Sequence, residues 1–286
     1  MKKKRKTIII LSVISTLLIA ASIWIAWGNT ALEVNTYSIA HEDLPEAFDG
    51  FRIAQVSDLH DAEIGKDNER LIAMLKDSKP DMIALTGDII DSRRTDIDAA
   101  LDFVNEAVKI APCYYVTGNH EANIEEYEEL KEGLIAAGVT VLENERVELE
   151  LNGEAITVVG IHDPLFDPEG RSSSRKVITR KFLEGLIRVD DGFTLLLAHR
   201  PEVFDVYVES DVDLVLSGHV HGGQFRLPFV GGIYVPNQGF FPEYDAGLFT
   251  EDNTNMIISR GIGNSTIPFR VNNRPEIVLV ELSLGE

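Results

Sequence analysis

The sequence contains little cysteine and few basic residues. Its single cysteine, Cys113, excludes an intrachain disulfide and a metal cluster held by several thiolates. The 286 residues include 26 Lys and Arg against 47 Asp and Glu, for a formal net charge of −21. Five of the bases fall in residues 1–6, which leaves 21 bases against 47 acids, a net charge of −26, in the remainder. Phosphodiester backbones repel so acidic a body, which disfavours a nuclease or another bulk nucleic-acid binder.

Tryptophan is also scarce, and both tryptophans mark one end of a long apolar run. Residues 7–27 contain no charged side chain, and about 20 apolar residues suffice to cross ~30 Å of hydrocarbon as a helix. Trp24 and Trp27 lie at the end of this run, where interfacial aromatic residues are common. Basic residues precede it, so the positive-inside rule predicts a cytoplasmic tail (1–6), a transmembrane anchor (7–27) and an extracytoplasmic body.

A cleaved secretory signal is the alternative interpretation of the apolar run. The apolar region of such a signal is usually only ~7–15 residues long. The sequence Ala26-Trp27-Gly28 is also a poor match to a small-x-small cleavage site. An uncleaved, single-pass anchor in the cell membrane is therefore favoured, and both alternatives place the body outside the cytoplasm.

The pattern of the remaining chain predicts one α/β domain. Residues 28–44 are expected to form a linker, and short apolar strands then alternate with amphipathic helices from about 51 to 137. This alternation predicts right-handed crossovers and a largely parallel sheet. Beyond residue 139 the strands are closely spaced, before a helix over 176–188 and a strand over 193–198. We expect a single domain over 45–286, with two sheets packed face to face and helices outside.

Five short polar motifs each follow a predicted strand. They are Asp58-Leu59-His60, Gly87-Asp88-Ile89-Ile90-Asp91, Gly118-Asn119-His120-Glu121, Ala198-His199-Arg200 and Gly218-His219-Val220-His221. Ligands of open α/β sheets bind outside the carboxyl ends of the strands, so these motifs are expected to converge. An extended backbone would place both polar side chains of Asp-x-His and of His-x-His on one side. The preceding glycines allow sharp turns and a close approach of the backbone to a ligand.

The polar side chains of these motifs predict a metal centre. The candidate ligands are Asp58, His60, Asp88, Asn119, His199, His219 and His221. Carboxylate, imidazole and one carboxamide without thiolate suit Mn, Fe or Zn better than a structural zinc site. Seven ligands are too many for one tetrahedral ion and suit two divalent ions that share a bridge. Two such ions ~3.5–4 Å apart can activate water and stabilise an in-line phosphoryl displacement.

The five motifs, in this order, resemble those of the calcineurin-like metallophosphoesterase superfamily. That pattern (D-x-H, G-D-x-x-D, G-N-H-[DE], a lone H and G-H-x-H) is matched at every position, and the resemblance extends from about Phe51 to the C-terminus. The resemblance implies a four-layer α/β/β/α sandwich of two mixed β-sheets flanked by helices. It also implies a dinuclear hydrolase of phosphate esters or pyrophosphates, in which a hydroxide bridging the metals attacks phosphorus.

The resemblance further implies a role for each residue. The first ion would be held by Asp58, His60, Asp88 and His221, and the second by Asp88, Asn119, His199 and His219. His120 would stay uncoordinated and donate a proton to the leaving oxygen or stabilise charge on the phosphoryl group. Asp91 would hydrogen-bond to His120, orient it and raise its pKa. With its anchor and Gly222-Gly223-Gln224, the chain looks most like membrane-anchored bacterial members, which include UDP-2,3-diacylglucosamine hydrolases acting on a nucleotide-linked glycolipid.

Several residues and one alternative function stay open at this point. His41 and His162 lie outside the motifs, whereas five arginines are candidate contacts to a substrate phosphate: Arg93, Arg94, Arg200, Arg260 and Arg270. The aromatics after the His-x-His motif fit a pocket wall, the membrane surface or a small satellite core.

The sequence predicts a membrane-anchored, metal-dependent phosphoesterase with a phosphorylated small-molecule or lipid-linked substrate. The alternative is a catalytically silent metal-binding scaffold at the cell surface; monoesters, diesters and pyrophosphates are equally open as substrates.

Overall fold

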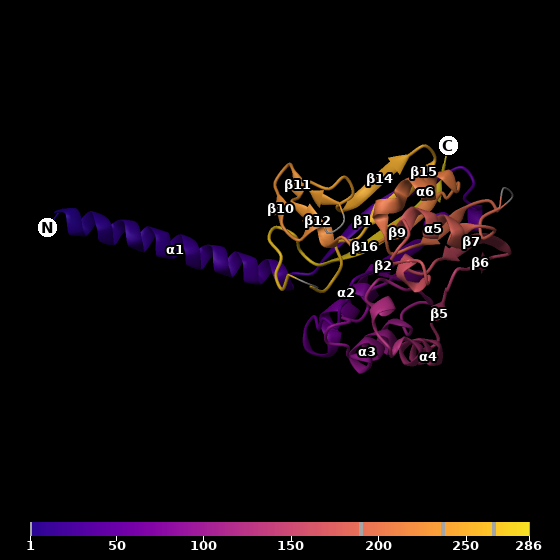
Figure 1. Cartoon of the computed structure of the whole chain (residues 1–286), viewed down its shortest axis with the longest axis horizontal. Coiled ribbons are helices and arrows are strands. Elements are labelled where there is room, and N and C mark those ends of the chain that lie inside the picture. The colour runs from indigo at the N-terminus through magenta and orange to yellow at the C-terminus, as the bar shows by residue number, and fades with distance from the viewer. Residues whose placement is uncertain (1, 189–190, 236–237, 265–266, 286) are drawn as a thin grey trace.

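A single long helix projects from the body at the N-terminus. The computed structural model describes residues 2–188, 191–235, 238–264 and 267–285, and α1 (Lys2–Thr30) extends away from all other elements (Figure 1). The predicted anchor, residues 7–27, lies within α1. Among the described residues, this is the one helix long and apolar enough to cross a membrane, and its apolar side chains are exposed. Such a surface is typical of a helix that lipid covers.

The body contains two six-stranded mixed sheets. In the first sheet, strands β2 to β5 run parallel while β16 runs antiparallel to β2. Its strand order is β1 (Glu33–His41), β16 (Glu276–Leu284), β2 (Arg52–Val56), β3 (Met82–Thr86), β4 (Cys113–Val116) and β5 (Thr140–Val141). The second sheet has the order β14 (Gly247–Glu251), β15 (Thr254–Ile258), β9 (Leu214–Ser217), β8 (Thr194–Leu197), β7 (Glu154–Gly160) and β6 (Glu145–Leu151). Both central regions are parallel, as the alternation of strands and helices predicts.

Three hydrophobic layers join the sheets and helices into the predicted four-layer sandwich. Alternate residues of one strand serve different layers: Leu195 and Leu197 of β8 pack between the sheets, whereas Leu196 packs against the outer helices. The first sheet is covered by α2 (Glu69–Ser78), α3 (Ile97–Ala107) and α4 (Tyr127–Ala137), and the second by α5 (Arg175–Leu183) and α6 (Phe204–Glu209) (Figure 1). The predicted fold class is thereby confirmed.

The predicted linker differs from the structure over residues 33–41. These residues form β1, which pairs in parallel with β16 from Glu33 opposite Glu276 to His41 opposite Leu284. Of this edge strand only Ile39 is fully buried, so its sequence carries little hydrophobic alternation. The strand forms because β16, which is distant in the sequence, supplies backbone N–H and C=O groups that hydrogen-bond to it. Local sequence patterns do not contain that information.

Helix ends also differ from the sequence-based expectation. The helix predicted over 176–188 ends at Leu183, because Gly185 adopts a left-handed conformation (φ 77°) that stops it. Residues 184–186 form a turn instead. The short helix α6 was not predicted, whereas α4 ends at Ala137, where the predicted alternation of strands and helices ends. None of these differences moves a polar motif away from its strand end.

Candidate metal centre

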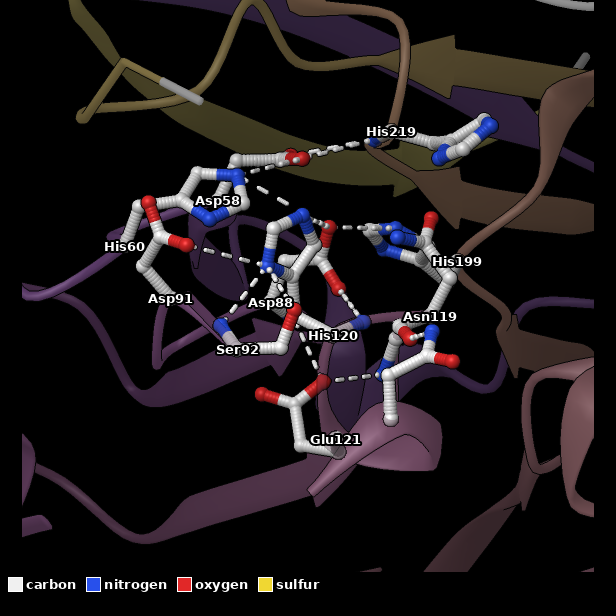
Figure 2. Close-up of polar contacts among 12 residues, drawn as sticks. Asp58, His60, Asp88, Asp91, Ser92, Asn119, His120, Glu121, His199 and His219 are labelled. Atoms are coloured by element: carbon white, nitrogen blue, oxygen red, sulfur yellow. Dashed lines mark hydrogen bonds and ion pairs between the residues drawn. The ribbon is translucent and has the colours of Figure 1, made fainter. Parts of the chain in front are cut away.

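The five polar motifs meet at the carboxyl ends of strands from both sheets. Figure 2 shows side chains from the loops after β2, β3 and β4 of the first sheet facing those after β8 and β9 of the second. Asp58, His60 and His221 bring one possible ligand atom each within 4.8 Å of one another. Asp88, His199 and His219 form a second such group. The structure therefore brings together residues that are far apart in the sequence, in two adjacent triads.

The distances within the first triad fit one coordination sphere. A bound Zn-like cation lies ~2.0–2.2 Å from its N and O ligands, so neighbouring ligand atoms are ~3–4 Å apart. The Nε2 atoms of His60 and His221 are 3.0 Å apart, and Asp58 Oδ1 lies 3.3 Å from His221 Nε2 and 3.9 Å from His60 Nε2. The three donors thus surround one point closely enough to share a cation.

Asp88 lies between the two triads. Its Oδ2 atom is 3.7 Å from His60 Nε2 on one side and 3.3 Å from His199 Nε2 on the other. A third imidazole, that of His120, has its Nε2 atom 4.0 Å away. One carboxylate oxygen therefore faces nitrogens that come from three different motifs, which is the position that a bridging ligand requires.

An unpartnered buried atom supplies an independent test of whether the residues fit a cation. Asn119 Oδ1 is buried and has no hydrogen-bond partner among the described residues, whereas buried His199 Nε2 is approached by Asp88 Oδ2 at 3.3 Å. A buried polar atom without a partner is costly unless another ligand satisfies it. The chemistry of these two atoms, a carboxamide oxygen and an imidazole nitrogen without thiolate, suits Mn, Fe or Zn. The family implies divalent metals, and these residues fit them.

Burial keeps several imidazoles of the centre neutral. It lowers the pKa of His60 to about 3, and it holds the pKa values of His219 and His221 well below the usual range. A neutral imidazole retains the lone pair that a cation needs. Burial also raises the pKa of Asp58 to about 6. His199 differs from the other imidazoles: burial lowers its pKa, but the facing Asp88 outweighs burial and raises it to about 10.

The backbone of the motifs is left-handed rather than extended. Asp58, His60, Asp88, His219 and His221 have φ between 47° and 71°. The expectation that Asp-x-His and His-x-His use an extended backbone is therefore wrong, although the side chains still converge. Each such conformation costs about 1–3 kcal/mol in a non-glycine residue, and conformations of this kind cluster at functional sites.

Glycines allow the motif loops to pack directly on the candidate ligands. Gly87 adopts φ 83°, whereas Gly118 and Gly218 are required by close approach. A Cβ atom at Gly118 would lie 2.2 Å from Asp88 Oδ1, and one at Gly218 would lie 2.3 Å from Asp58 Oδ2. Glycine thus allows the close approach expected from the sequence.

Substitution of Gly218 by alanine is expected to lower metal content without unfolding the body. The added methyl group would overlap Ser57 Oγ at 1.9 Å and push the Asp58 carboxylate out of the first triad. Metal analysis of purified protein should show a reduced metal-to-protein ratio, with activity recovering at high added metal. The matched control is Gly28→Ala near the end of α1, because no atom lies within 4 Å of a Cβ there. Equal metal content in both variants would contradict this role.

Glu121 holds two motif loops together from beneath. Its fully buried carboxylate accepts hydrogen bonds from the backbone N–H groups of Asp88 (3.0 Å), Ile89 (2.8 Å) and Gly118 (2.7 Å). Burial and the nearby Asp88 raise its pKa to about 8, against the opposing effect of these donors. The sequence spacing did not indicate this role for Glu121, because an extended strand would point its side chain away from the site.

Replacing Glu121 by glutamine is expected to destabilise the body. The amide group cannot accept from all three N–H donors, so at least one buried donor loses its partner, at a cost of about 1–3 kcal/mol. Thermal unfolding should show a lower midpoint for Glu121→Gln than for Glu125→Gln, a matched change at an exposed position. Equal midpoints for the two variants would show that the three hydrogen bonds contribute nothing to stability.

His120 is held by the loop after β3, but not mainly by Asp91. The backbone N–H of Ser92 donates to His120 Nδ1 at 2.9 Å, and Asp91 Oδ1 lies farther away, at 3.5 Å. The expected hydrogen bond between Asp91 and His120 is therefore only a 3.5 Å approach, and the shorter contact to His120 is the hydrogen bond from the Ser92 backbone. Since Nδ1 accepts from Ser92, the ring proton lies on Nε2, the nitrogen that faces Asp88.

Asp91 instead pairs with Arg93. Its Oδ1 accepts from Arg93 Nε at 3.1 Å and from the Arg93 backbone at 3.0 Å, and its Oδ2 accepts from Nη2 at 2.9 Å. Burial raises the pKa of Asp91, but the hydrogen bonds from Arg93 outweigh burial and bring it to about 2. Asp91 is thus an anion that fixes Arg93 beside His120.

Two of the five candidate substrate-binding arginines are buried, and a third is partly buried. Arg200 is 2% exposed, donates to Asp163 Oδ2 at 2.6 Å and reaches His219 Nε2 at 3.1 Å. Arg270 is 1% exposed and reaches His221 Nδ1 at 3.2 Å. Arg260 pairs with Glu276. Arg200 and Arg270 therefore position the histidines of the last motif, a role that sequence reasoning missed because their partners come from distant segments.

The remaining two arginines lie where a substrate can reach them. An open pocket of about 460 Å³ is lined by His60, Asp61, Ala62, Arg93, Arg94, Asn264 and Pro268. The side chain of Arg94 is 76% exposed and lies 3.8 Å from Asp91.

Of the histidines outside the motifs, His162 contacts Thr117 Oγ1 at 3.0 Å, and His41 Nε2 lies 3.2 Å from Asp213. Neither residue joins the two triads.

Comparisons with known proteins identify the same family that the five motifs resemble. A family model described as "Calcineurin-like phosphoesterase" matches residues 51–223, a range that contains all five motifs. The Bacillus subtilis metallophosphoesterase YkuE is 32% identical over 260 residues, which cover 88% of this chain and 85% of that protein. Phosphodiesterase YaeI of Escherichia coli is 31% identical over 216 residues, 74% of this chain and 73% of that protein. The structure of TT1561 from Thermus thermophilus shares the fold, with a TM-score of 0.51 and 14% identity over 74% of this chain and 90% of that one.

Proposed function

Because the chain belongs to the calcineurin-like phosphoesterase family, and is thus a metal-dependent hydrolase of phosphoric esters, we propose that its two triads hold a pair of divalent ions. The observation that carries the proposal is the position of Asp88, whose Oδ2 faces His60 and His199 at 3.7 and 3.3 Å. When bound, two such ions activate water for attack on phosphorus and stabilise the charge that develops on the phosphoryl oxygens.

The ligand assignment follows the two triads. Asp58, His60 and His221 would hold the first ion, Asn119, His199 and His219 the second, and Asp88 would contribute to both. Support for Asn119 comes from its buried, unpartnered Oδ1 atom. Arg200 and Arg270 would then fix the ring planes of His219 and His221 through the 3.1 and 3.2 Å contacts. Such outer contacts orient metal-binding imidazoles in other proteins.

We assign proton transfer to His120. Ser92 holds Nδ1 as an acceptor, which leaves the Nε2 proton facing the space beside Asp88. A phosphoester that binds there loses an alkoxide or a phosphate, and the Nε2–H group can donate a hydrogen bond to that leaving oxygen. Transfer of the Nε2 proton takes place from the imidazolium form, whose additional proton on Nδ1 faces Asp91 Oδ1 at 3.5 Å, and it leaves a neutral ring. General acid catalysis of this kind contributes about 10²–10⁴-fold to a rate.

The experiment that tests this function combines metal analysis with an activity screen. The full-length protein, reconstituted with Mn, Fe or Zn, would be assayed on a phosphomonoester, a phosphodiester and a nucleotide-sugar pyrophosphate. Two ions per chain and hydrolysis in at least one class are expected. One ion or none in active protein would contradict the dinuclear assignment, and metal-loaded protein that hydrolyses no phosphoester would revive the silent scaffold. All seven candidate ligands are present, which favours the enzyme.

Arg94 is expected to bind the substrate rather than take part in catalysis. Its exposed guanidinium lines the pocket beside His60, where it can contact phosphate oxygens at an entering ester. Changing Arg94 to alanine should raise KM by about 3- to 10-fold, the loss of one partly exposed charge-assisted contact, with little change in kcat. The control Lys66→Ala removes the same charge from an exposed side chain that pairs with Asp67. A fall in kcat alone would contradict the assignment.

The substrate is proposed to be extracytoplasmic. Basic residues at the start of α1, before its apolar run, favour a cytoplasmic N-terminus, so the body would face the other side of the membrane. A nucleotide-linked glycolipid precursor made in the cytoplasm would then be on the wrong side. We therefore favour a phosphate ester or pyrophosphate exposed outside the cytoplasm, on a small molecule or a lipid head group.

A further inference from the structure

Two small hairpins of the body carry an unusual number of exposed apolar side chains. They are β10 (Arg226–Leu227) with β11 (Gly231–Gly232), and β12 (Tyr234–Val235) with β13 (Gly239–Phe240). Phe229 is completely exposed, and Phe240 and Phe241 are 72% and 63% exposed. We call the exposed group here the apolar tip: Leu227, Phe229, Val230, Phe240, Phe241 and Phe269. Soluble surfaces rarely gather such side chains unless they contact a partner or a membrane.

Hydrogen bonds tie the apolar tip to the last turns of α1. Trp24 Nε1 donates to Asn272 Oδ1 at 3.1 Å, and Asn272 Nδ2 donates to the carbonyl oxygen of Arg226 at 3.4 Å. Asn29 exchanges two hydrogen bonds, of 2.7 and 2.9 Å, with the backbone of Arg270. Figure 1 shows β10, β11 and β12 at the end of the body where α1 joins it.

The length of α1 determines how deep these contacts lie. The 21 uncharged residues from Thr7 to Trp27 rise about 31 Å at ~1.5 Å per residue, which equals the ~30 Å thickness of a bilayer's hydrocarbon core. Trp24 and Trp27 therefore lie at the boundary between hydrocarbon and head groups. Arg226, bonded through Asn272 to Trp24, lies close to that depth, and Leu227 follows it directly.

We propose that the apolar tip inserts into the surface of the same bilayer that α1 spans. The proposal rests on the proposed anchoring of α1, and it commits to lipid because the contacts with Trp24 and Asn29 place the tip beside the end of the span. A second contact with lipid fixes the rotation of the body about the helix axis. Pro268 of the substrate pocket directly precedes Phe269 of the apolar tip, so insertion of the tip would bring that wall of the pocket near the membrane surface.

Nitroxide labels on single introduced cysteines in the full-length chain can test this placement. The native Cys113 is 1% exposed, so labelling is expected at the introduced positions. The protein would be reconstituted in phosphatidylcholine nanodiscs as Phe229→Cys or Phe240→Cys, and collisions with oxygen and with a water-soluble nickel chelate would be compared. Both labels should favour oxygen several-fold more than the controls Ile135→Cys and Val177→Cys, whose native side chains are 53% and 56% exposed on the helices α4 and α5.

A further label and an activity assay distinguish failure of this proposal from failure of the proposed anchor and of the proposed enzyme. Leu17→Cys lies in the middle of α1 and reports whether that helix is in lipid. Tip labels as accessible to nickel as the controls, with Leu17 in lipid, would overturn the proposal and leave the anchor standing. A Leu17 label accessible to nickel would overturn both. Tip labels shielded from both probes would indicate a second protein copy on the tip, which also overturns insertion, and hydrolysis measured on the same samples reports the enzyme separately.

Discussion

Replacing Asp88 by asparagine is expected to remove bound metal and to lower turnover by at least about 10³-fold, because a neutral amide neither bridges two cations nor supplies the charge they need. The carboxylate faces His60 and His199 from between the two triads. Its other oxygen, Oδ1, accepts the backbone N–H of His120 at 2.7 Å. Asparagine keeps that acceptor, so the loop carrying His120 should stay in place.

Metal stoichiometry and turnover of Asp88→Asn would be measured together on folded protein. Asp98→Asn, at an exposed position on α3, is the matched control and should retain both. Asp88→Ala should be worse in stability, since it also leaves the His120 N–H group without its partner at a cost of about 1–3 kcal/mol. Wild-type metal content in Asp88→Asn would remove this carboxylate from the ligand set.

Replacing His120 by alanine is expected to separate catalysis from metal binding. Metal content should stay near the wild-type value, whereas turnover should fall by about 10²–10⁴-fold, the usual contribution of a general acid. The loss should depend on the substrate. An ester whose leaving group is a nitrophenol needs little protonation and should lose less rate than an ester of an aliphatic alcohol.

Two variants sharpen this test of His120. Ser92→Ala removes the hydroxyl 3.1 Å from Nδ1 but keeps the backbone donor at 2.9 Å, so turnover should change little. Asp91→Asn weakens the hold on Arg93 and should affect KM more than kcat, because Arg93 lines the pocket. Equal losses of His120→Ala on both leaving groups would show that His120 does not act as the acid.

Much of the site could be predicted from the sequence because motifs follow strands. Hydrophobic strands such as Met82–Thr86 are readable locally, and parallel strands end on one edge of a sheet, so the polar residues after them had to converge. The seven candidate ligands were found this way. The left-handed backbone of five of them was not, because Asp and His adopt that conformation only occasionally and the sequence does not mark where they do so.

The supporting contacts could not be predicted, for a different reason. Arg200, Arg270 and Glu121 look like ordinary charged residues, and each acquires its role only from partners contributed by distant segments. The same holds for β1, whose partner β16 is the last strand of the chain. Periodicity describes what one segment buries, whereas these contacts depend on which segments become neighbours.

The pairing of β1 with β16 has a consequence for how the protein matures. Glu33 follows the end of α1 by three residues, yet its partner Glu276 is made 243 residues later. During synthesis the first strand of the body therefore stays unpaired until both sheets and their helices have been made. Long-range strand pairing of this kind is slow and leaves strand edges exposed to aggregation in the meantime. Completion of the first sheet, rather than of its local helices, thus ends the period in which the edge of β16 is exposed to misassembly.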